Sequence, residues 1–321
     1  MRFGLRAFSL LCALWRFALQ FAWASPLDQF DPNDPSASGY RKVFEDDFID
    51  NAGIDLNRTG KPGYRWYLTK FIKGHVPTPP ESLVVKDGVL TLTPTDSTNW
   101  SLASAGPSQN GTGYVGQAFG GGFFVEARIS FSPNLSNAER GWPAFWSIAI
   151  EKLTLNGADH WEDQEPEFEH FAEDDLFEYN ISAWAGPNSF TSTMLDWYGK
   201  WRKTCSEGFC RIGNFGKPSR FDNHVVHIRE VVNWREFHRI AQLWIPATSE
   251  PNSKGYIQNY FDGLPTRSRV SWSKYQEGTP PPPTGDAIFS IIDRQHLVII
   301  IGSGMDQPLR VDWVRVWQLQ K

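Results

Sequence analysis

The stretch FFVEARISF, residues 123–131, shows most directly how this chain folds. Every second residue from Phe123 to Phe131 is apolar, and Glu126, Arg128 and Ser130 stand between them. Because successive side chains of a β-strand point to opposite faces, this alternation predicts a strand with its apolar face toward a core.

A second stretch, SLVVKDGVLTLT at residues 82–93, predicts a β-hairpin. Asp87 and Gly88 stand between two strand-like runs, and this dipeptide favours the tight turn that joins antiparallel strands. The hairpin adds to the evidence for an antiparallel, all-β fold.

The organisation of the chain indicates one all-β domain. Short strand candidates recur along the sequence, glycine and proline punctuate it, and helical periodicity is scarce, which favours a β-sandwich over alternating strands and helices. We expect a single domain over residues 41–321, after an extended leader at 25–40 that contains Pro26, Pro32 and Pro35. The four prolines at 280–283 predict a surface loop, and no internal repeat is present.

The first 24 residues have the pattern of a signal peptide. Arg2 and Arg6 precede an apolar stretch, and Ala22 and Ala24 form a small-x-small cleavage pattern. Cleavage would remove three of the 31 cationic residues, leaving 28 against 36 acidic ones, so the mature chain carries about −8. The sequence therefore predicts a secreted protein, and its acidity disfavours nucleic acid or anionic lipid as a partner.

Cys12 would leave with this leader, so two cysteines remain, Cys205 and Cys210. Gly208 between them allows a turn, and in an exported protein such a pair favours a disulfide, with two free thiols as the alternative. The short loop offers too few further ligands for a metal site.

The segment EDDLFE, residues 173–178, is unusual because it sets acids on a strand-like run rich in aromatic residues. Glu173 and Asp175 share a face of a strand, whereas Glu178 would point the other way unless a one-residue bulge at Leu176 or Phe177 returned it. Paired carboxylates are what glycoside hydrolysis requires. A solvated acidic strand and a calcium-binding patch are the alternatives.

This acidic segment resembles the E-x-D-x-x-E signature of glycoside hydrolase family 16, the laminarinase and lichenase-like β-glucanases. Further segments resemble strands of that family and follow in its order along the chain. They are FEDDF at 44–48, AFGGGFFVEAR at 118–128, GWPAFW at 141–146, FHRIAQLW at 237–244, YFDG at 260–263 and VDWVRVW at 311–317.

The resemblance implies a concanavalin A-like β-jelly-roll sandwich of two antiparallel sheets with a concave substrate cleft. In that fold Glu173 would be the nucleophile, Glu178 the general acid/base and Asp175 the assisting acid of a retaining mechanism. The implied protein is a secreted, monomeric endo-β-glycosidase that hydrolyses β-1,3 or mixed-linkage β-glucan and requires no cofactor. The alternatives are a transglycosylase with the same acids and a non-catalytic glycan-binding sandwich.

Fifteen tryptophans suggest a groove that holds sugar, because the flat faces of sugars stack on indole rings. The resemblance places Trp142 and Trp146 in the cleft, and Trp184 and Trp197 follow the acids and are candidates to flank it. For any single tryptophan, burial in the core is the alternative. Trp244, Trp313 and Trp317 lie in the closing strands, and we expect them to be structural.

The resemblance also suggests a structural calcium ion on the side away from the cleft. Its candidate ligands are Glu45, the carbonyl of Gly122 and Asp312, since calcium prefers carboxylate and carbonyl oxygens together. The alternative is that Asp312 ends a strand ladder or pairs with an arginine.

Some positions depart from the family pattern. Asp174 replaces the usual aliphatic residue, and we expect it on the outer face, solvated or paired. A histidine common after the catalytic strand is missing, and Asp196 either takes part of its role or is a solvated loop acid. His238 is expected to be a satisfied core histidine rather than a cleft residue. The segment IIIGSG at 299–304 also departs, which leaves the substrate open.

Overall fold

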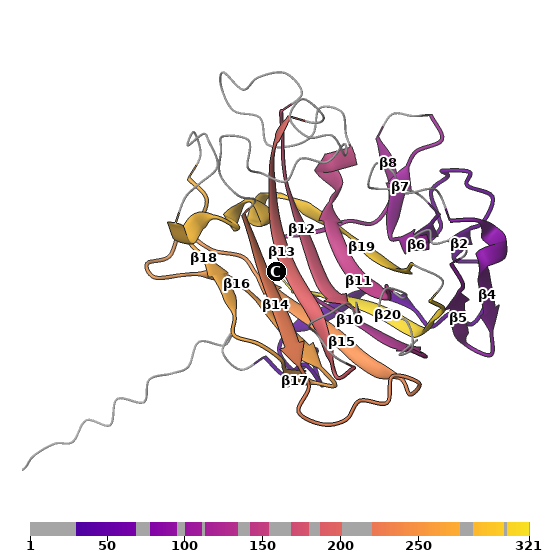
Figure 1. Cartoon of the computed structure of the whole chain (residues 1–321). Coiled ribbons are helices and arrows are strands. Elements are labelled where there is room, and N and C mark those ends of the chain that lie inside the picture. The colour runs from indigo at the N-terminus through magenta and orange to yellow at the C-terminus, as the bar shows by residue number, and fades with distance from the viewer. Residues whose placement is uncertain are drawn as a thin grey trace, which may run out of the picture.

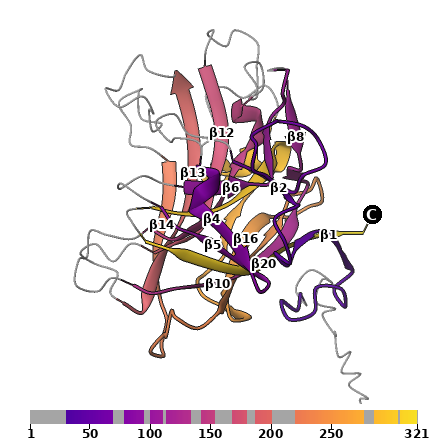
Figure 2. The same ribbon diagram turned by 90° about the vertical axis from the view of Figure 1, so that its right-hand side faces the viewer.

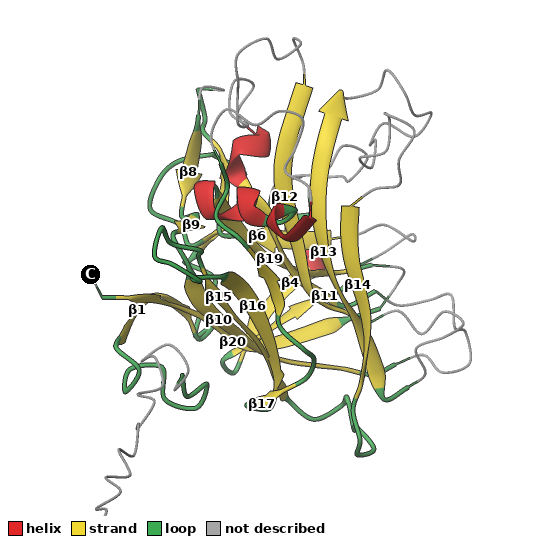
Figure 3. Ribbon diagram, turned by 90° about the vertical axis from the view of Figure 1, so that its left-hand side faces the viewer, coloured by secondary structure: helices red, strands yellow, loops and turns green. Residues whose placement is uncertain are grey.

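The computed structural model describes residues 30–68, 78–94, 100–110, 113–133, 142–153, 168–179, 187–200, 220–276, 285–304 and 307–320. The predicted signal peptide, the two cysteines and the four prolines at 280–283 lie outside these ranges. In the described residues two large β-sheets face each other (Figure 1), and the helical turns are short (Figure 3). The jelly-roll sandwich expected from the resemblance is therefore confirmed.

One sheet, called here the back sheet, has nine strands in the described residues. Its strands in spatial order are β17 (Leu264–Pro265), β16 (Gly255–Phe261), β15 (His238–Ile245), β10 (Phe123–Phe131), β20 (Leu309–Leu319), β5 (Val89–Leu92) and β4 (Leu83–Lys86), with β1 (Tyr40–Asp46) paired to β20 and β18 (Val270–Trp272) paired to β16.

The other sheet contains the acidic segment and is called here the acid sheet. Its strands in spatial order are β14 (Arg220–His227), β13 (Ser189–Lys200), β12 (Phe168–Glu178), β11 (Ala144–Ala149), β19 (His296–Ser303), β6 (Trp100–Ala103), β3 (Trp66–Tyr67) and β2 (Ile54–Asp55), with β9 (Phe119–Gly120) paired to β19. Only β2 and β3 pair in parallel among the described strands.

The remaining elements are short. They are the two-stranded sheet of β7 (Ala105–Pro107) and β8 (Tyr114–Gly116), and the 3₁₀ turns η2 (Pro80–Ser82), η3 (Ile150–Leu153), η4 (Gly285–Ala287) and η5 (Ser290–Arg294). No helix in the described residues is long and apolar enough to span a membrane.

The predicted hairpin is present as β4 and β5, with Lys86 opposite Val89. Asp87 and Gly88 have φ angles of 53° and 74°. Positive φ at both central residues is what a type I′ turn needs, and Asp-Gly meets that need at low cost.

The core lies between the two sheets, and β10 supplies one wall of it. Phe123, Val125, Ala127 and Ile129 are fully buried there, as the alternation predicts. The other face of β10 is also covered, because Phe124 packs in a second apolar cluster on the outside of the back sheet. The chain thus buries both faces of its central strands.

Part of that second cover comes from the leader, which is not extended as predicted. Residues 31–39 form consecutive turns, and the ring of Phe30 lies 4.9 Å from that of Phe124 and 5.2 Å from that of Tyr40. Side-chain oxygens stabilise the turns, since Asp31 accepts from the Asn33 amide and Asp34 from the Ala37 amide. Such local bonds outweigh the extended preference of the prolines.

Candidate active site on strand β12

A one-residue bulge at Leu176 shapes β12. Phe145 of β11 lies opposite Phe177, and the next residue, Trp146, lies opposite Asp175, so Leu176 has no partner of its own on β11. The ladder with β13 shifts at the same place. The bulge that is needed to return Glu178 to the face of Glu173 and Asp175 is therefore present.

The bulge sorts the side chains of β12 between its two faces. Phe177 points into the core, where its ring lies 4.8 Å from that of Phe190 and 5.7 Å from that of Trp234. Glu173, Asp175 and Glu178 consequently share the outer face of the acid sheet, which is the face away from the back sheet. This is the arrangement that the signature requires.

The bulge also shortens the span between the two glutamates. Glu173 lies opposite Ile148 and Glu178 opposite Ala144, so four strand steps separate them instead of five. At about 3.3 Å per step, the backbone separation falls from about 16 Å to about 13 Å. Two glutamate side chains that lean toward each other then have less distance to close.

Solvent reaches these acids only in part. Glu173 and Asp175 are each 7% exposed, and Glu178 is half-buried. Trp146, opposite Asp175 and on the same face, is 8% exposed. Trp142 lies just before β11, and its Nε1–H donates a 2.8 Å hydrogen bond to Glu178 Oε1. Both tryptophans predicted for the cleft therefore lie beside the acids.

Gln295 holds the main chain of β12 just before Glu173. Its Oε1 accepts a 2.8 Å bond from the Ala172 amide, and its Nε2 donates a 2.9 Å bond to the His170 carbonyl. Since β11 ends opposite this point, the Gln295 amide acts as one further rung of the ladder. Sequence reasoning missed this residue, because nothing local marks a contact across 123 residues.

Asp174 lies on the face opposite the acids, as expected, but that face is the core and not an outer surface where it would be solvated or paired. It is 0% exposed on the core side of β12, and its Oδ1 accepts a 3.1 Å bond from Nε2 of Gln242 on β15. Burial raises the pKa of Asp174 to about 7, against the opposing effect of the Gln242 hydrogen bond. The expectation was wrong because in a sandwich the face opposite the acids is the core and not solvent.

Asp196 lies on that same core side, so it does not supply the missing histidine's polar role. It is opposite Ala172, and its Oδ1 lies 2.6 Å from His170 Nε2, with both side chains fully buried. The residue that faces Glu173 from β13 is Leu195. His238 is on the back sheet, away from the acids, and Asp262 Oδ2 lies 2.8 Å from its Nδ1, so it has a hydrogen-bond partner as expected, but it is half-buried and not a core residue.

The other predicted groove tryptophans are less well defined. Trp184 lies outside the described residues, and for Trp197 only the backbone is described, which pairs with Phe171. Trp244 is fully buried and Trp317 is 8% exposed on the back sheet, which agrees with structural roles. Cys205 and Cys210 lie outside the described residues, so their pairing stays a prediction.

The three candidate calcium ligands do not come together. Phe124 pairs with Trp317 and Arg128 with Trp313, so Gly122 and Asp312 lie near opposite ends of the β10–β20 ladder, about 20 Å apart. Asp312 forms an ion pair with Arg128, which was the alternative, and Glu45 pairs with Arg315 at 2.9 Å. Within the described residues no cluster of His, Cys, Asp and Glu could hold a metal ion.

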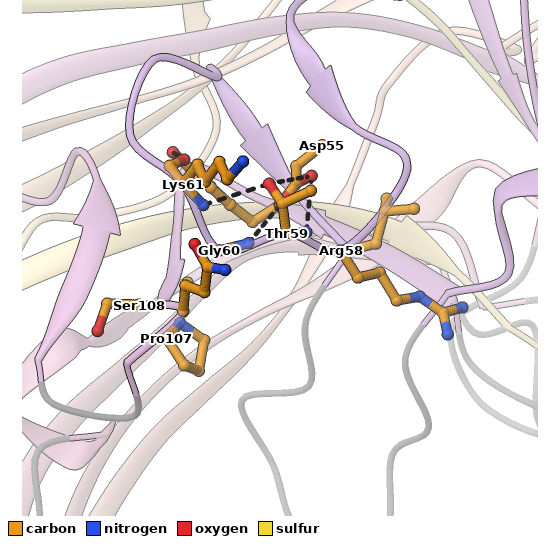
Figure 4. Close-up of a pocket in the computed structure, with 11 residues that line it drawn as sticks. Asp55, Arg58, Thr59, Gly60, Lys61, Pro107 and Ser108 are labelled. Atoms are coloured by element: carbon orange, nitrogen blue, oxygen red, sulfur yellow. Dashed lines mark hydrogen bonds between the residues drawn. The ribbon is translucent and has the colours of Figure 1, made fainter.

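A pocket of about 680 Å³ (Figure 4) lies at the far edge of the acid sheet. In the strand order of that sheet, β11, β19 and β6 lie between the pocket and β12. Asp55 organises its wall, because its carboxylate accepts bonds from the Thr59 amide and hydroxyl and from the Gly60 amide. Arg58 and Lys61 add positive charge. No pattern in the sequence predicted this pocket, which is separate from the acids.

Comparisons with known proteins agree on the fold. No family model and no curated protein matches the sequence. Among solved structures, an endo-1,3-beta-glucanase from Streptomyces sioyaensis is 19% identical with a TM-score of 0.52, over 88% of this chain and 98% of that chain. A 1,3-alpha-1,4-beta-D-galactose-4-sulfate-3,6-anhydro-D-galactose 4 galactohydrolase is 14% identical with a TM-score of 0.51, over 87% and 96%.

A glycoside hydrolase family 16 endo-glucanase from Bacteroides ovatus is also similar, with 10% identity and a TM-score of 0.43 over 85% of this chain and 99% of that chain. The chain thus has the jelly-roll sandwich of the glucanase from Streptomyces sioyaensis and of the galactohydrolase. This is the fold that the resemblance to glycoside hydrolase family 16 implies.

Proposed function

We propose that this protein is a retaining endo-β-glycosidase that hydrolyses a β-glucan-type polysaccharide. The observation that carries the proposal is the bulge at Leu176, which brings Glu173, Asp175 and Glu178 to one face of β12 beside two tryptophans. A chain that only needed to fold would gain nothing from three acids on one face, since like charges there repel.

In the proposed mechanism Glu173 attacks the anomeric carbon and forms a covalent glycosyl-enzyme. Glu178 first protonates the departing glycosidic oxygen and then takes a proton from the incoming water. Retention requires the two carboxyl groups to end about 5–5.5 Å apart, and the shortened span of β12 favours this separation.

Asp175 stands between the two glutamates on the same face. A negative charge there favours the protonated form of a neighbouring acid, so Asp175 would assist Glu178 as the proton donor. The Trp142 indole, whose N–H bonds to Glu178, fixes the direction of that carboxyl group. Trp146 offers an aromatic surface on which a sugar ring can stack.

The substrate proposed first is a β-1,3-glucan or a mixed-linkage β-glucan. The endo-1,3-beta-glucanase that shares the fold supports this choice, whereas the galactohydrolase that shares it as well makes a galactan the next candidate. Purified protein should be tested on laminarin, lichenan, xyloglucan, agar and carrageenan with reducing-end detection. Release of short oligosaccharides from laminarin or lichenan is expected, and no release from any of the five would contradict the proposal.

The stereochemistry of cleavage provides a separate test. Proton NMR of the earliest products should show the β-anomer before mutarotation, because double displacement retains configuration. An initial α-anomer would mean an inverting enzyme. Products longer than the substrate would indicate that a sugar hydroxyl replaces water, which is the transglycosylase reaction.

We also propose that residues 1–24 are removed on secretion, that the mature protein is a monomer and that Cys205 and Cys210 form a disulfide. The intact mass of the exported protein, before and after reduction and alkylation, tests the first and third points. We expect the mass of a chain that begins at Ser25. This mass should change on alkylation only if the protein has first been reduced. Light scattering tests the monomer.

A further inference from the structure

A cluster of polar side chains lies between the two sheets, directly behind the proposed catalytic acids. It connects Asp174 of β12, Gln242 of β15, Asn259 of β16 and Ser192 of β13, all at most 3% exposed. The Gln242 amide donates to Asp174 Oδ1 at 3.1 Å and to Asn259 Oδ1 at 2.9 Å, and the Asn259 amide donates to Ser192 Oγ. Asp174 is thus the point where β12 is joined to the back sheet by polar bonds.

The hydrogen bonds of this cluster are incomplete in one respect. Among the described residues, neither Asp174 Oδ2 nor Gln242 Oε1 has a hydrogen-bond partner. Both atoms are acceptors if Asp174 is ionised, and two buried acceptors without donors are costly. A proton on Asp174 Oδ2 supplies the missing donor, and a carboxylic acid facing a primary amide then exchanges two complementary hydrogen bonds.

The charges around Asp174 oppose each other. Arg267 acts to lower the pKa of Asp174, but it forms an ion pair with Asp222, whose charge acts to raise that pKa, and it donates to the Ser192 carbonyl. His170 and Asp196, on the same core face, pair with each other, and His224 is exposed on the edge strand β14. Burial is the main cause that raises the pKa of Asp174, and Asp222 adds to it.

We propose that Asp174 is a positioning residue that works as a neutral carboxylic acid, paired with Gln242 to hold the middle of β12 against the back sheet. This inference rests on the proposed function, because Glu173 and Asp175 are the backbone neighbours of Asp174 and leave the strand on its opposite face. Movement of β12 at Asp174 would therefore misdirect both acids. Ionisation of Asp174 breaks its pair with Gln242 and leaves a charge in the core. Glu173 and Asp175 therefore lose their catalytic orientation as pH rises.

The test compares Asp174→Asn, Asp174→Leu and Glu126→Gln with the wild type. Asparagine keeps the shape and the two complementary bonds but cannot ionise, whereas leucine removes the polar partner of Gln242. Glu126 is the matched control, since it is also a buried acid whose pKa burial raises to about 7, but it lies on the outside of the back sheet.

We expect the ratio of kcat of Asp174→Asn to that of the wild type to stay within about twofold at pH 5–6 and to rise at least threefold by pH 8. Taking a ratio at each pH cancels the titration of the catalytic acids themselves. KM should change little. Asp174→Leu should lower kcat about tenfold at every pH, and Glu126→Gln should leave the kcat profile unchanged.

Melting temperatures give a readout that does not depend on activity. A raised pKa in the folded protein means that Asp174 stabilises the fold below about pH 4, and that this contribution is lost as pH rises to about 7. The melting temperature of Asp174→Asn relative to the wild type should therefore increase between pH 4 and 7 and stay constant above.

Parallel pH dependences of Asp174→Asn and the wild type, in both kcat and melting temperature, would overturn the proposal. So would a changed kcat profile in Glu126→Gln. If the wild type cleaves none of the polysaccharides, the proposed function fails, while the melting curves still decide whether Asp174 is neutral in the folded protein. If Asp174→Leu does not fold, the asparagine variant alone decides the outcome.

Discussion

Strand β12 carries acids on both faces, and its two faces surround them differently. On the outer face Glu173 and Asp175 keep 7% of their surface exposed, and Glu178 is bonded to the Trp142 indole. On the core face Asp174 is fully buried against a single amide. Acids separated by one peptide unit on the same strand therefore have different surroundings, which suit the catalytic roles proposed for the outer acids and the positioning role proposed for Asp174.

The largest effect on activity is expected when the proposed catalytic acids of the outer face are replaced one at a time. Glu173→Gln and Glu178→Gln should each lower kcat by about 10²–10⁴-fold, because each removes a nucleophile or a proton donor and keeps the side-chain volume. Melting temperatures should stay close to that of the wild type, and substrate should still bind. Glu45→Gln on the back sheet is the control. Near wild-type activity in either variant would refute both assigned roles.

The next largest effect, on both stability and kcat, is expected when the hydrogen bonds from the Gln295 side chain to the main chain of β12 are removed. Gln295→Leu leaves the buried Ala172 amide and His170 carbonyl without their partner, which should lower the free energy of unfolding by about 2–4 kcal/mol. Urea unfolding measures this, and kcat should fall with it because Glu173 follows Ala172.

The matched control is Gln318→Leu. The Gln318 amide bonds to the carbonyls of Gly120 and Gly122 near the half-buried end of β20. It should cost about 1 kcal/mol or less and leave kcat unchanged. An equal loss of kcat in both glutamine variants would mean that general destabilisation, and not the position of β12, limits activity.

Trp142→Phe tests whether the indole N–H orients Glu178 on the outer face. The variant keeps an aromatic ring and removes the N–H that bonds to Glu178. Glu178 becomes a carboxylate as it protonates the departing oxygen, and a hydrogen bond to a charged group contributes about 1.5–3 kcal/mol, so kcat/KM should fall about tenfold or somewhat more. Trp313→Phe, on the back sheet, should have no effect. An unchanged kcat/KM for Trp142→Phe would show that the indole does not orient Glu178.

The smallest expected effect contrasts the buried Asp174 with the partly exposed pair of His238 and Asp262. The hydrogen bond between them raises the pKa of His238. Burial alone would raise the pKa of Asp262, but the hydrogen bonds from His238 and from the Arg239 amide outweigh burial and lower that pKa. The histidine's contribution to stability is present below about pH 6.5 and is lost as pH rises through its raised pKa. The aspartate's contribution is present above about pH 4 and is lost as pH falls.

His238→Gln should therefore lower stability by about 1 kcal/mol or less near pH 5–6, because Asp262 is 42% exposed and solvent screens the pair. The difference from the wild type should shrink toward pH 9. Thermal melts across this range measure it. A difference that is constant with pH would mean that the pair is not charged, in contrast to the pH dependence expected for Asp174.

The sequence predicted those features that depend on neighbouring residues. The hairpin at Asp87-Gly88, the alternation of β10 and the bulge of β12 all follow from local spacing, and the structure contains each of them. The turns of the leader were missed because short polar side chains compete locally with the extended preference of proline.

What the sequence could not predict are contacts between distant segments. Gln295 reaches Ala172 across 123 residues and Gln242 reaches Asp174 across 68, and no local pattern marks either contact. The same reasoning explains the error at Asp174. Alternation correctly separated it from Glu173 and Asp175, but alternation alone does not tell whether the opposite face meets water or a second sheet.

The position of β20 has a consequence for how the chain is made. This strand, the last of those that the structure describes, lies inside the back sheet between β10 and β5, and it also pairs with β1, the first described strand (Figure 2). Until β20 is synthesised, β10 and β1 lack the neighbour that satisfies their main-chain groups and covers their apolar side chains. Pairing between segments that are far apart in the sequence is slow, and in the meantime the unpaired strand edges are exposed to aggregation. The back sheet of the nascent chain therefore cannot be completed until β20 has been synthesised.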